Sequence, residues 1–254
     1  MGLKTPVSPE RLREFFNPGS VALVGATEKS MWSVITYNNL KALKFPGKIY
    51  PVNSNRDSVH GEKAYKSLLD IEGPVDLAYV MVPTGQIMNV MREAASKKIR
   101  NLVVLTSGFR EVGQEGAKLE EELHQFAIDN DQLILGPNGN GFVNFSSMIT
   151  PYGLQLTPPL HKGPVGVILQ SGALASAVLA LAQARNIGFS FIVSMGNETM
   201  IDATDMIDYL IEDEETKVIA LFLESIRYPA EFLRVARKAF ERGKPIVALK
   251  IGRS

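Results

Sequence analysis

The chain has 254 residues, a length that corresponds to one or two domains with sizeable cores. Lysine plus arginine and aspartate plus glutamate both total 27, so the chain has no basic excess that would favour nucleic acid as its main partner. Cysteine is absent, which excludes disulfides, thiolate zinc sites and a cysteine nucleophile. No apolar run reaches the length of a membrane span, and the N-terminus lacks the apolar stretch of a signal peptide. We therefore expect a cytoplasmic protein that does not associate with membranes.

In chain order, nine short apolar runs rich in Val, Ile and Leu alternate with segments of helical periodicity. Continuous runs of this kind are typical of strands that are buried on both faces of a parallel sheet. The helical segments include residues 117–130 and 230–242, where apolar residues recur on one helix face. This alternation predicts an α/β protein with doubly wound, mainly parallel sheets. The runs are Val21–Val24, Ile49–Val52, Leu77–Val82, Leu102–Leu105, Leu133–Leu135, Val165–Leu169, Phe191–Ser194, Val218–Leu223 and Ile246–Ile251.

Residues 146–162 break this rhythm with three prolines and no clear period, so we interpret them as a linker. Residues 1–145 and 163–254 then form two α/β domains, and each opens with a strand, a glycine-rich turn and a helix. The second domain is short and ends on an apolar run with no helix to cover it. We therefore expect this domain to be incomplete at its C-terminus.

The residues that follow the predicted strands are the candidate ligand-binding residues, because ligands of open parallel sheets bind outside the carboxyl ends of the strands. These residues are mostly small or hydrogen-bonding, which suits a ligand that carries phosphate and contacts several loops. They include Gly25-Ala26-Thr27, Asn53, Pro83, Ser107-Gly108-Phe109, Asn138, Gln170-Ser171-Gly172 and Glu224.

The first of these turns does not support a nicotinamide cofactor. It reads Gly25-Ala-Thr-Glu-Lys-Ser30 and lacks the G-x-G-x-x-G pattern. An NAD site also requires an acidic residue at the end of the second strand to hold the ribose diol, and Asn53 stands there. An NAD-dependent dehydrogenase is therefore disfavoured.

In the second half, Gln170-Ser171-Gly172 leads from a strand into an alanine-rich helix, and its free N–H groups suit a phosphoryl group. Ile168 occupies the first glycine position of a nucleophile elbow, and the three histidines of the chain lie in loops or on a polar helix face, so a catalytic triad is unsupported. Glu224 directly follows an apolar run. A carboxylate at this place either has a partner, because burying an unpaired charge is costly, or lies just past the strand end in water. No spacing of His, Asp and Glu suggests a metal site.

At these residues the sequence resembles the NDP-forming acyl-CoA synthetases, which are relatives of the succinyl-CoA synthetase α subunit. The resemblance covers nearly the whole chain, and its motifs occur in order and at family-like spacing. They are Asn17-Pro-Gly-Ser-Val-Ala-Leu-Val-Gly-Ala26, Tyr50-Pro-Val-Asn53, Val75-Asp-Leu77, Val82-Pro83, Thr106-Ser-Gly-Phe-Arg-Glu111, Gly136-Pro-Asn138, Gln170-Ser-Gly-Ala173, Ile187-Gly-Phe-Ser190, Gly196-Asn197 and Lys250-Ile-Gly-Arg-Ser254.

The resemblance implies a Rossmann-like coenzyme A-binding domain followed by a flavodoxin-like ligase domain. It implies that Ser171, Gly172 and Ala173 form a helix N-terminus that receives a phosphohistidine, and that Glu224 holds this histidine. The implied reaction joins a carboxylic acid to CoA at the expense of ATP, through a phosphohistidine and an acyl phosphate. ATP and Mg²⁺ would bind an ATP-grasp domain or β subunit outside this chain, in an oligomer. The implied CoA-binding residues are Gly25, Ala26, Thr27, Asn53, Val82, Pro83, Ser107, Gly108, Phe109 and Asn138.

The sequence departs from the family pattern in three places. None of its histidines matches the phosphohistidine, which is expected shortly past Ser254, so the chain alone should not complete a turnover. Asn55 stands where a lysine is common, which removes a cation that would favour a CoA phosphate. Gly139 replaces a common cysteine. A CoA-sensing or acyl-CoA-sensing module of a larger protein, such as a protein acetyltransferase, remains the alternative to the enzyme.

Overall fold

A computed structural model describes residues 5–157 and 160–251. The first half builds a five-stranded parallel sheet in the order β2-β1-β5-β6-β7. Its elements are α1 (Pro9–Phe16), β1 (Ser20–Val24), α2 (Met31–Ala42), β2 (Lys48–Val52), the hairpin strands β3 (Ser58–Val59) and β4 (Glu62–Lys63), β5 (Leu77–Val80), α3 (Ile87–Ser96), β6 (Asn101–Val104), α4 (Gln114–Asp129) and β7 (Leu133–Leu135).

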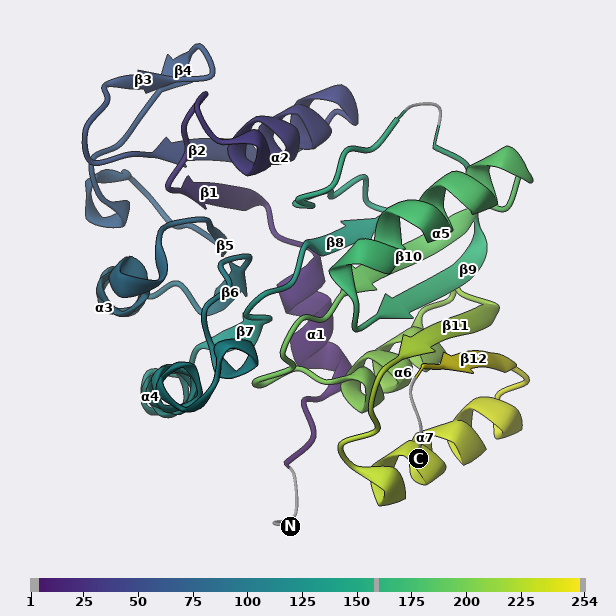
Figure 1. Ribbon diagram of the computed structural model, residues 1–254. Helices are drawn as coiled ribbons and strands as arrows, with labels where there is room; N and C mark the ends of the chain where they lie inside the picture. Colours follow the sequence, from purple (N-terminus) through teal and green to yellow (C-terminus); the bar gives the residue numbers. More distant parts are fainter. Residues whose placement is uncertain (1–4, 158–159, 252–254) are drawn as a thin grey trace.

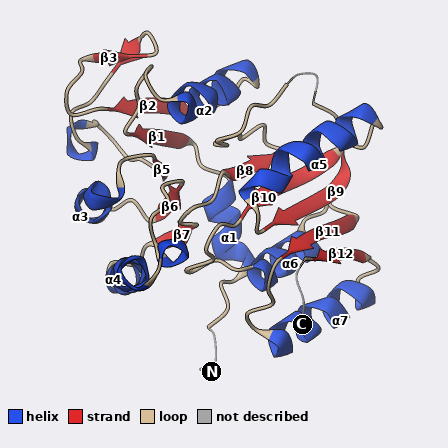
Figure 2. Ribbon diagram, in the orientation of Figure 1, coloured by secondary structure: helices blue, strands red, loops and turns tan. Residues whose placement is uncertain are grey.

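The second half builds another five-stranded sheet in the order β12-β11-β9-β10-β8, in which only β8 runs antiparallel to its neighbour. Helix α5 covers one face of this sheet, and α6 and α7 cover the other (Figure 2). The elements are β8 (Gly141–Asn144), β9 (Lys162–Leu169), α5 (Gly172–Ala184), β10 (Phe189–Ser194), α6 (Ala203–Glu212), β11 (Val218–Leu223), α7 (Pro229–Glu241) and β12 (Ile246–Lys250).

The predicted α/β class with doubly wound, mainly parallel sheets is confirmed, since each of the nine apolar runs contains a strand. The two predicted helices are α4 and α7, and α7 begins at Pro229 and stops before Gly243, whose φ is +66°. Strand β8 and the β3–β4 hairpin are elements that the apolar pattern did not predict. Among the described residues, no helix is long and apolar enough to cross a membrane.

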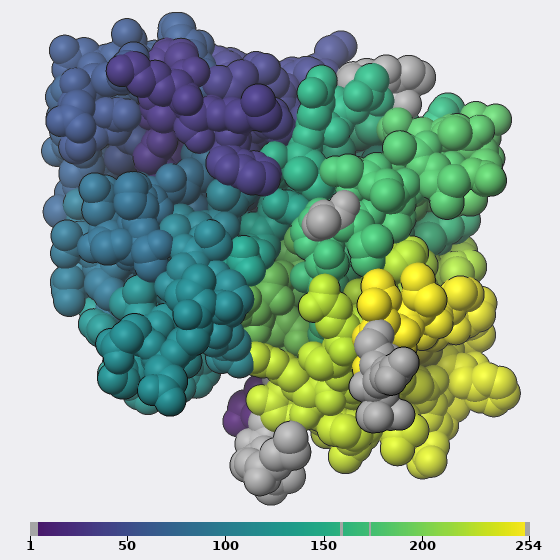
Figure 3. Space-filling view, in the orientation of Figure 1, coloured from purple at the N-terminus to yellow at the C-terminus, as the bar shows by residue number. Residues whose placement is uncertain are grey.

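The first half of the chain contributes a strand to the second sheet where the halves meet. Strand β8, which belongs to residues 1–145, pairs with β10 of the second sheet. The first residues of the segment interpreted as a linker pack against both halves of the chain. Ile149 and Tyr152 are buried in clusters that include residues of the second sheet. Asn39 of α2 donates hydrogen bonds to the carbonyls of Tyr152 and Leu154. Residues 158 and 159 of this segment lie outside the described part. In Figure 3 the halves adjoin along one boundary, purple to teal against green to yellow.

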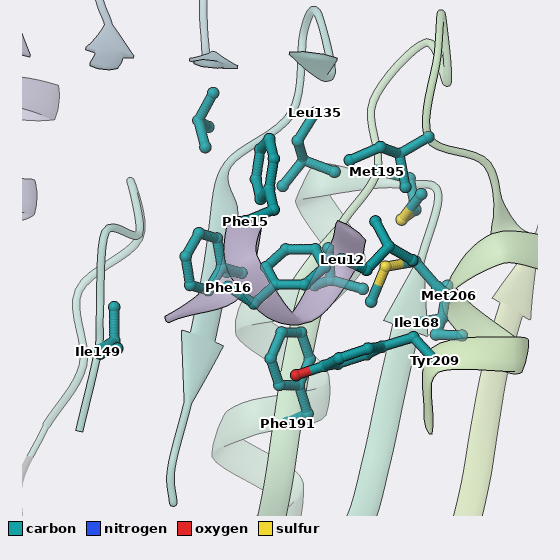
Figure 4. Packing of buried hydrophobic residues seen from close by; sticks show 14 of the residues in the cluster. Leu12, Phe15, Phe16, Leu135, Ile149, Ile168, Phe191, Met195, Met206 and Tyr209 are labelled. Atoms are coloured by element: carbon teal, nitrogen blue, oxygen red, sulfur yellow. The ribbon is translucent and has the colours of Figure 1, made fainter. Parts of the chain in front are cut away.

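Helix α1 fills the space between the two sheets (Figure 1). Its Phe16 ring contacts Phe142 of β8, Phe191 of β10 and Tyr209 of α6, with ring centroids 4.8, 5.0 and 5.4 Å apart. Figure 4 shows Phe16, Phe191 and Tyr209 close together with Leu12 and Phe15 of α1, which are also fully buried. Because this cluster draws on both sheets, its burial stabilises the arrangement of the halves as well as each half.

Candidate functional site

The first candidate site lies where the strand order of the first sheet reverses. From β1 the chain leads to β2 on one side and then returns past β1 to β5 on the other, so the connections diverge between β1 and β5. Such a switch point leaves a crevice at the carboxyl ends of the strands. An open cavity of about 560 Å³ occupies this position, lined by the loops after β1, β2 and β5 and by α3. This volume lies in the range of small-molecule sites.

The structure brings five of the ten expected CoA-binding residues into this cavity: Gly25, Thr27, Asn53, Val82 and Pro83. Ala26 is buried behind them. Ser107, Gly108, Phe109 and Asn138 lie outside the cavity lining, on the loops that follow β6 and β7.

Gly25, in the loop after β1, lies close to Met81 and Val82 in the loop after β5. Its φ is +86°, a conformation that favours glycine. A Cβ atom at this position would lie 3.0 Å from Val82 Cγ1 and 3.1 Å from the Met81 carbonyl carbon. The Gly25 and Ala26 N–H groups donate to the Val52 carbonyl at 3.0 and 3.1 Å, which ties the loop to the end of β2. The glycine therefore allows the two sides of the switch point to approach each other.

Asn53 cross-links the loops that line the cavity. Its Nδ2 donates to the Ala26 carbonyl at 2.8 Å, and its Oδ1 accepts the Asn55 N–H at 2.8 Å. An acidic residue could not donate to that carbonyl, so the asparagine that disfavours NAD also has a structural role here.

The start of α2 supplies the available N–H groups at this site. Ser30 is the N-cap residue and lines the cavity, and its side chain makes no capping hydrogen bond. The first-turn N–H groups of a helix have no intrahelical partner and attract anions. By contrast, the Thr27 N–H donates to Ser33 Oγ at 2.8 Å. The helix start, rather than the glycine turn itself, is therefore the part of the β1–α2 connection suited to phosphate.

His60, from the β3–β4 hairpin, supports the same turn. Its Nε2 lies 2.9 Å from Ser33 Oγ, and its ring stacks on Tyr37 with centroids 4.6 Å apart. Burial lowers the pKa of His60, and the nearby carboxylate of Glu28 opposes this effect. No local pattern in the sequence connects His60 with Ser33, because the two are 27 residues apart and the hairpin brings them together.

Ser107, Gly108 and Phe109 lie on the loop after β6, where the Ser107 carbonyl accepts the Thr84 hydroxyl at 2.7 Å. The Glu111 carboxylate accepts hydrogen bonds from the N–H groups of Gly108 and Phe109, at 2.6 and 3.2 Å. The Phe109 side chain is fully buried in the core of the first half, so only its backbone is available to a ligand. Asn138 is exposed, and its N–H donates to the Thr106 carbonyl.

A buried carboxylate joins these loops to the second half. Glu120 of α4 is 1% exposed. Its carboxylate accepts hydrogen bonds from the Arg110 N–H, from Asn197 Nδ2 and from the Thr199 hydroxyl. The carboxylate also forms an ion pair with the Arg110 guanidinium. Asn197 and Thr199 follow β10 of the second sheet. The arrangement fixes the loop after β6 against the loop after β10, and nothing in the sequence singled out Glu120.

The second candidate site lies at the switch point of the second sheet. There the chain leads from β9 to β10 and then back past β9 to β11, so the crevice lies between β9 and β11. Ser171 and Gly172 follow β9 at the start of α5, with Ala173 in its first turn, and Glu224 follows β11. Ser171 is the N-cap residue, and its side chain makes no capping hydrogen bond.

Gln170 connects the two sides of this crevice. Its Oε1 accepts the N–H groups of Glu224 and Ser225 at 2.6 and 2.9 Å, and its Nε2 donates to the buried Glu198 carboxylate at 3.0 Å. The Glu224 side chain is exposed. Of the two environments considered for this carboxylate, the structure shows the one just past the strand end, open to solvent.

Asn140 links the loop after β7 to the second candidate site. Its Nδ2 donates to the Gly172 carbonyl at 3.3 Å, its N–H donates to Ser194 Oγ, and its carbonyl accepts the Tyr79 hydroxyl. The loop that carries Asn138 therefore contacts the start of α5 directly. Among the described residues, no group of three or more His, Asp or Glu side chains is arranged to hold a metal ion.

Comparison with known proteins agrees with this geometry. A model of the CoA binding domain matches residues 19–144, and a model of the succinyl-CoA ligase like flavodoxin domain matches residues 162–254. An ADP-forming acetate–CoA ligase of Methanocaldococcus jannaschii is 40% identical over 93% of this chain and 33% of its own length. The α subunit of acetate–CoA ligase [ADP-forming] II of Pyrococcus furiosus is 37% identical over 94% of this chain and 52% of its own length.

Solved structures give the same result. PH0766 from Pyrococcus horikoshii OT3 superposes with a TM-score of 0.89 at 36% identity, over 95% of this chain and 55% of that one. Acetyl-coenzyme A synthetase 1 of Ca. Korarchaeum cryptofilum, in complex with phosphate and ADP, superposes with a TM-score of 0.88 at 34% identity, over 96% of this chain and 52% of that one. The chain thus spans between a third and about half of these relatives. Over most of its length the chain therefore consists of a CoA binding domain and a succinyl-CoA ligase like flavodoxin domain, and it is similar to the corresponding parts of ADP-forming CoA ligases.

Proposed function

We propose that this chain is the CoA-binding and phosphoryl-transfer part of an ADP-forming acyl-CoA synthetase. The observation that carries the proposal is the cavity at the switch point between β1 and β5, where Gly25 and Val82 meet. It lies within the residues that match the CoA binding domain. The relatives reported above are ligases and synthetases, which favours an enzyme over a CoA-sensing module.

In this proposal the diphosphate of CoA binds at the start of α2, beside Gly25 and Thr27, because free N–H groups there attract anions. The pantetheine arm then runs past Pro83 toward Ser107 and Asn138. Since Asn140 joins the Asn138 loop to the start of α5, this path leads the thiol to the second candidate site.

The reaction proceeds by transfer of one phosphoryl group. The γ-phosphoryl of ATP moves to a histidine nitrogen and ADP leaves; a carboxylate oxygen of the acid then takes the phosphoryl group from the histidine, which forms an acyl phosphate. The CoA thiolate attacks the acyl carbon, and inorganic phosphate leaves. In this chain the N-terminus of α5, with Ser171, Gly172 and Ala173, would stabilise the phosphorylated histidine, and Glu224 would orient its imidazole.

The remaining parts of the enzyme are also proposals. One relative is named as an α subunit, and one related structure contains phosphate and ADP. We therefore place ATP and Mg²⁺ in an ATP-grasp domain or partner subunit. We place the phosphorylated histidine outside residues 1–254, because no histidine of this chain matches the family's.

Calorimetric titration of the 254-residue chain with CoA and, separately, with NAD tests the proposal. We expect saturable heat from CoA and none from NAD, because Asn53 offers no carboxylate to a ribose diol. Equal binding of both cofactors, or no binding of CoA, would contradict it.

A further inference from the structure

The cavity of the first half contains one basic side chain among its lining residues, and that residue is Lys66. It lies at the end of the cavity formed by the loop after β2, with Ser54 and Asn55. One acidic residue, Glu93 of α3, also lines the cavity, and its carboxylate accepts hydrogen bonds from Ser67 Oγ and the Leu68 N–H. The amino group of Lys66 is therefore the positive charge that this end of the cavity offers.

The backbone on both sides of Lys66 is fixed. Tyr65 exchanges hydrogen bonds with the end of β2: its N–H donates to the Pro51 carbonyl at 2.9 Å, and its carbonyl accepts the Asn53 N–H at 2.8 Å. On the other side, Ser67 is bound to the Glu93 carboxylate at 2.7 Å. The Lys66 backbone is thus held beside the carboxyl end of β2, while its long side chain remains about half exposed.

The end of the second strand is where a Rossmann-type sheet contacts the adenosine ribose of its cofactor, and an arginine there accommodates a ribose phosphate. Coenzyme A carries a phosphate on the 3′ oxygen of that ribose. The residue in the β2 loop itself, Asn55, is neutral. We propose that Lys66 binds the 3′-phosphate of CoA and makes the site select CoA over 3′-dephospho-CoA. This inference rests on the proposed binding of CoA in this cavity.

The amino group of Lys66 pairs with the Asp57 carboxylate at 2.7 Å. Asp57 is 94% exposed, and ion pairs between exposed groups contribute little to stability. A phosphate brings about two negative charges and three acceptor oxygens to the amino group, so it competes favourably with this single carboxylate. Arg56, the neighbouring cation, is already paired with Glu28 at 3.0 Å.

The test compares CoA with 3′-dephospho-CoA by calorimetric titration of the full 254-residue chain and of Lys66→Gln. We expect the unchanged chain to prefer CoA by about tenfold, which corresponds to about 1.4 kcal/mol, the strength of one charge-assisted hydrogen bond. Lys66→Gln should bind both ligands with the affinity that the unchanged chain shows for dephospho-CoA, and Lys66→Arg should restore the preference. Lys63→Gln is the matched control, since Lys63 ends β4, three residues before Lys66, and lies outside the cavity lining.

The outcomes separate the two proposals. Binding of CoA with a preference that Lys66→Gln leaves unchanged would overturn the role of Lys66 and leave CoA binding in place. An equal loss of preference in Lys63→Gln would also overturn it, since the effect would then be one of general charge. Absence of binding of either ligand by the unchanged chain would contradict the proposed function and this inference with it.

Discussion

The replacement of Gly25 by alanine tests whether the close approach of the β1 loop to β5 is necessary for the site. Two costs are expected. The positive φ of +86° costs an alanine about 1–2 kcal/mol. In addition, the new Cβ would lie 3.0 Å from Val82 Cγ1 and 3.1 Å from the Met81 carbonyl carbon, and such overpacking costs about 1–3 kcal/mol.

Gly73→Ala is the matched control for the first cost. Gly73 has a φ of +80°, and a Cβ there would meet no atom within 4 Å. We therefore expect Gly73→Ala to lose about 1–2 kcal/mol from the positive φ alone. Gly25→Ala should lose about 2 kcal/mol more, which for a chain of this size corresponds to a midpoint roughly 4–8 °C lower.

The assay combines thermal unfolding with calorimetric titration by CoA. Because the loops at Gly25 and Val82 both line the cavity, pushing them apart should weaken CoA binding in Gly25→Ala by about tenfold or more, while Gly73→Ala should bind normally. Equal unfolding midpoints for the two variants, or unchanged CoA affinity in Gly25→Ala, would refute the reasoning that this approach shapes the site.

Three further variants test the packing and electrostatics of the chain. Phe16→Ala should lower the free energy of unfolding by about 3–5 kcal/mol in urea titrations, since its buried ring contacts elements of both halves; a loss below 1 kcal/mol would argue against this core. Glu120→Ala should lose about 3 kcal/mol in the same assay, because it leaves buried donors unpaired, and a neutral effect would contradict the network. Burial lowers the pKa of His60 in the folded state, so below about pH 6.5 the unfolded state binds the proton more readily and stability falls. His60→Gln should therefore lose less stability between pH 7.5 and 5.5 than the unchanged chain, and identical losses would refute a lowered pKa of this partly buried imidazole.

Most strands of both sheets were predictable because their apolar runs carry the signal locally, and inner strands such as β1 and β5 are fully buried. Strand β12 comes from the same kind of apolar run, although most of its residues are exposed. Strand β8 was not predictable, because Gly141–Asn144 is four residues long and pairs with β10, nearly fifty residues later. The packing of helix α1 was also not predictable. Its periodicity is visible in the sequence, but the aromatic residues that it contacts come from both halves of the chain.

The candidate site was predictable in part. Gly25, Asn53 and Val82 follow strands, and the carboxyl ends of parallel strands meet at one edge, so their assembly follows from strand order. Lys66 could not be placed in this way, because it reaches the cavity only through the pairing of Tyr65 with β2. Phe109 follows a strand as well, but its side chain turns into the core, and position along the chain does not reveal that direction.

The central claim is that CoA binds at the switch point between β1 and β5. A crystal structure of the chain soaked or grown with CoA tests it most directly. The account predicts density for the CoA diphosphate at the start of α2, between Gly25 and Asn53, with the ribose phosphate beside Lys66. Density for CoA elsewhere on the chain, with this cavity empty, would contradict it.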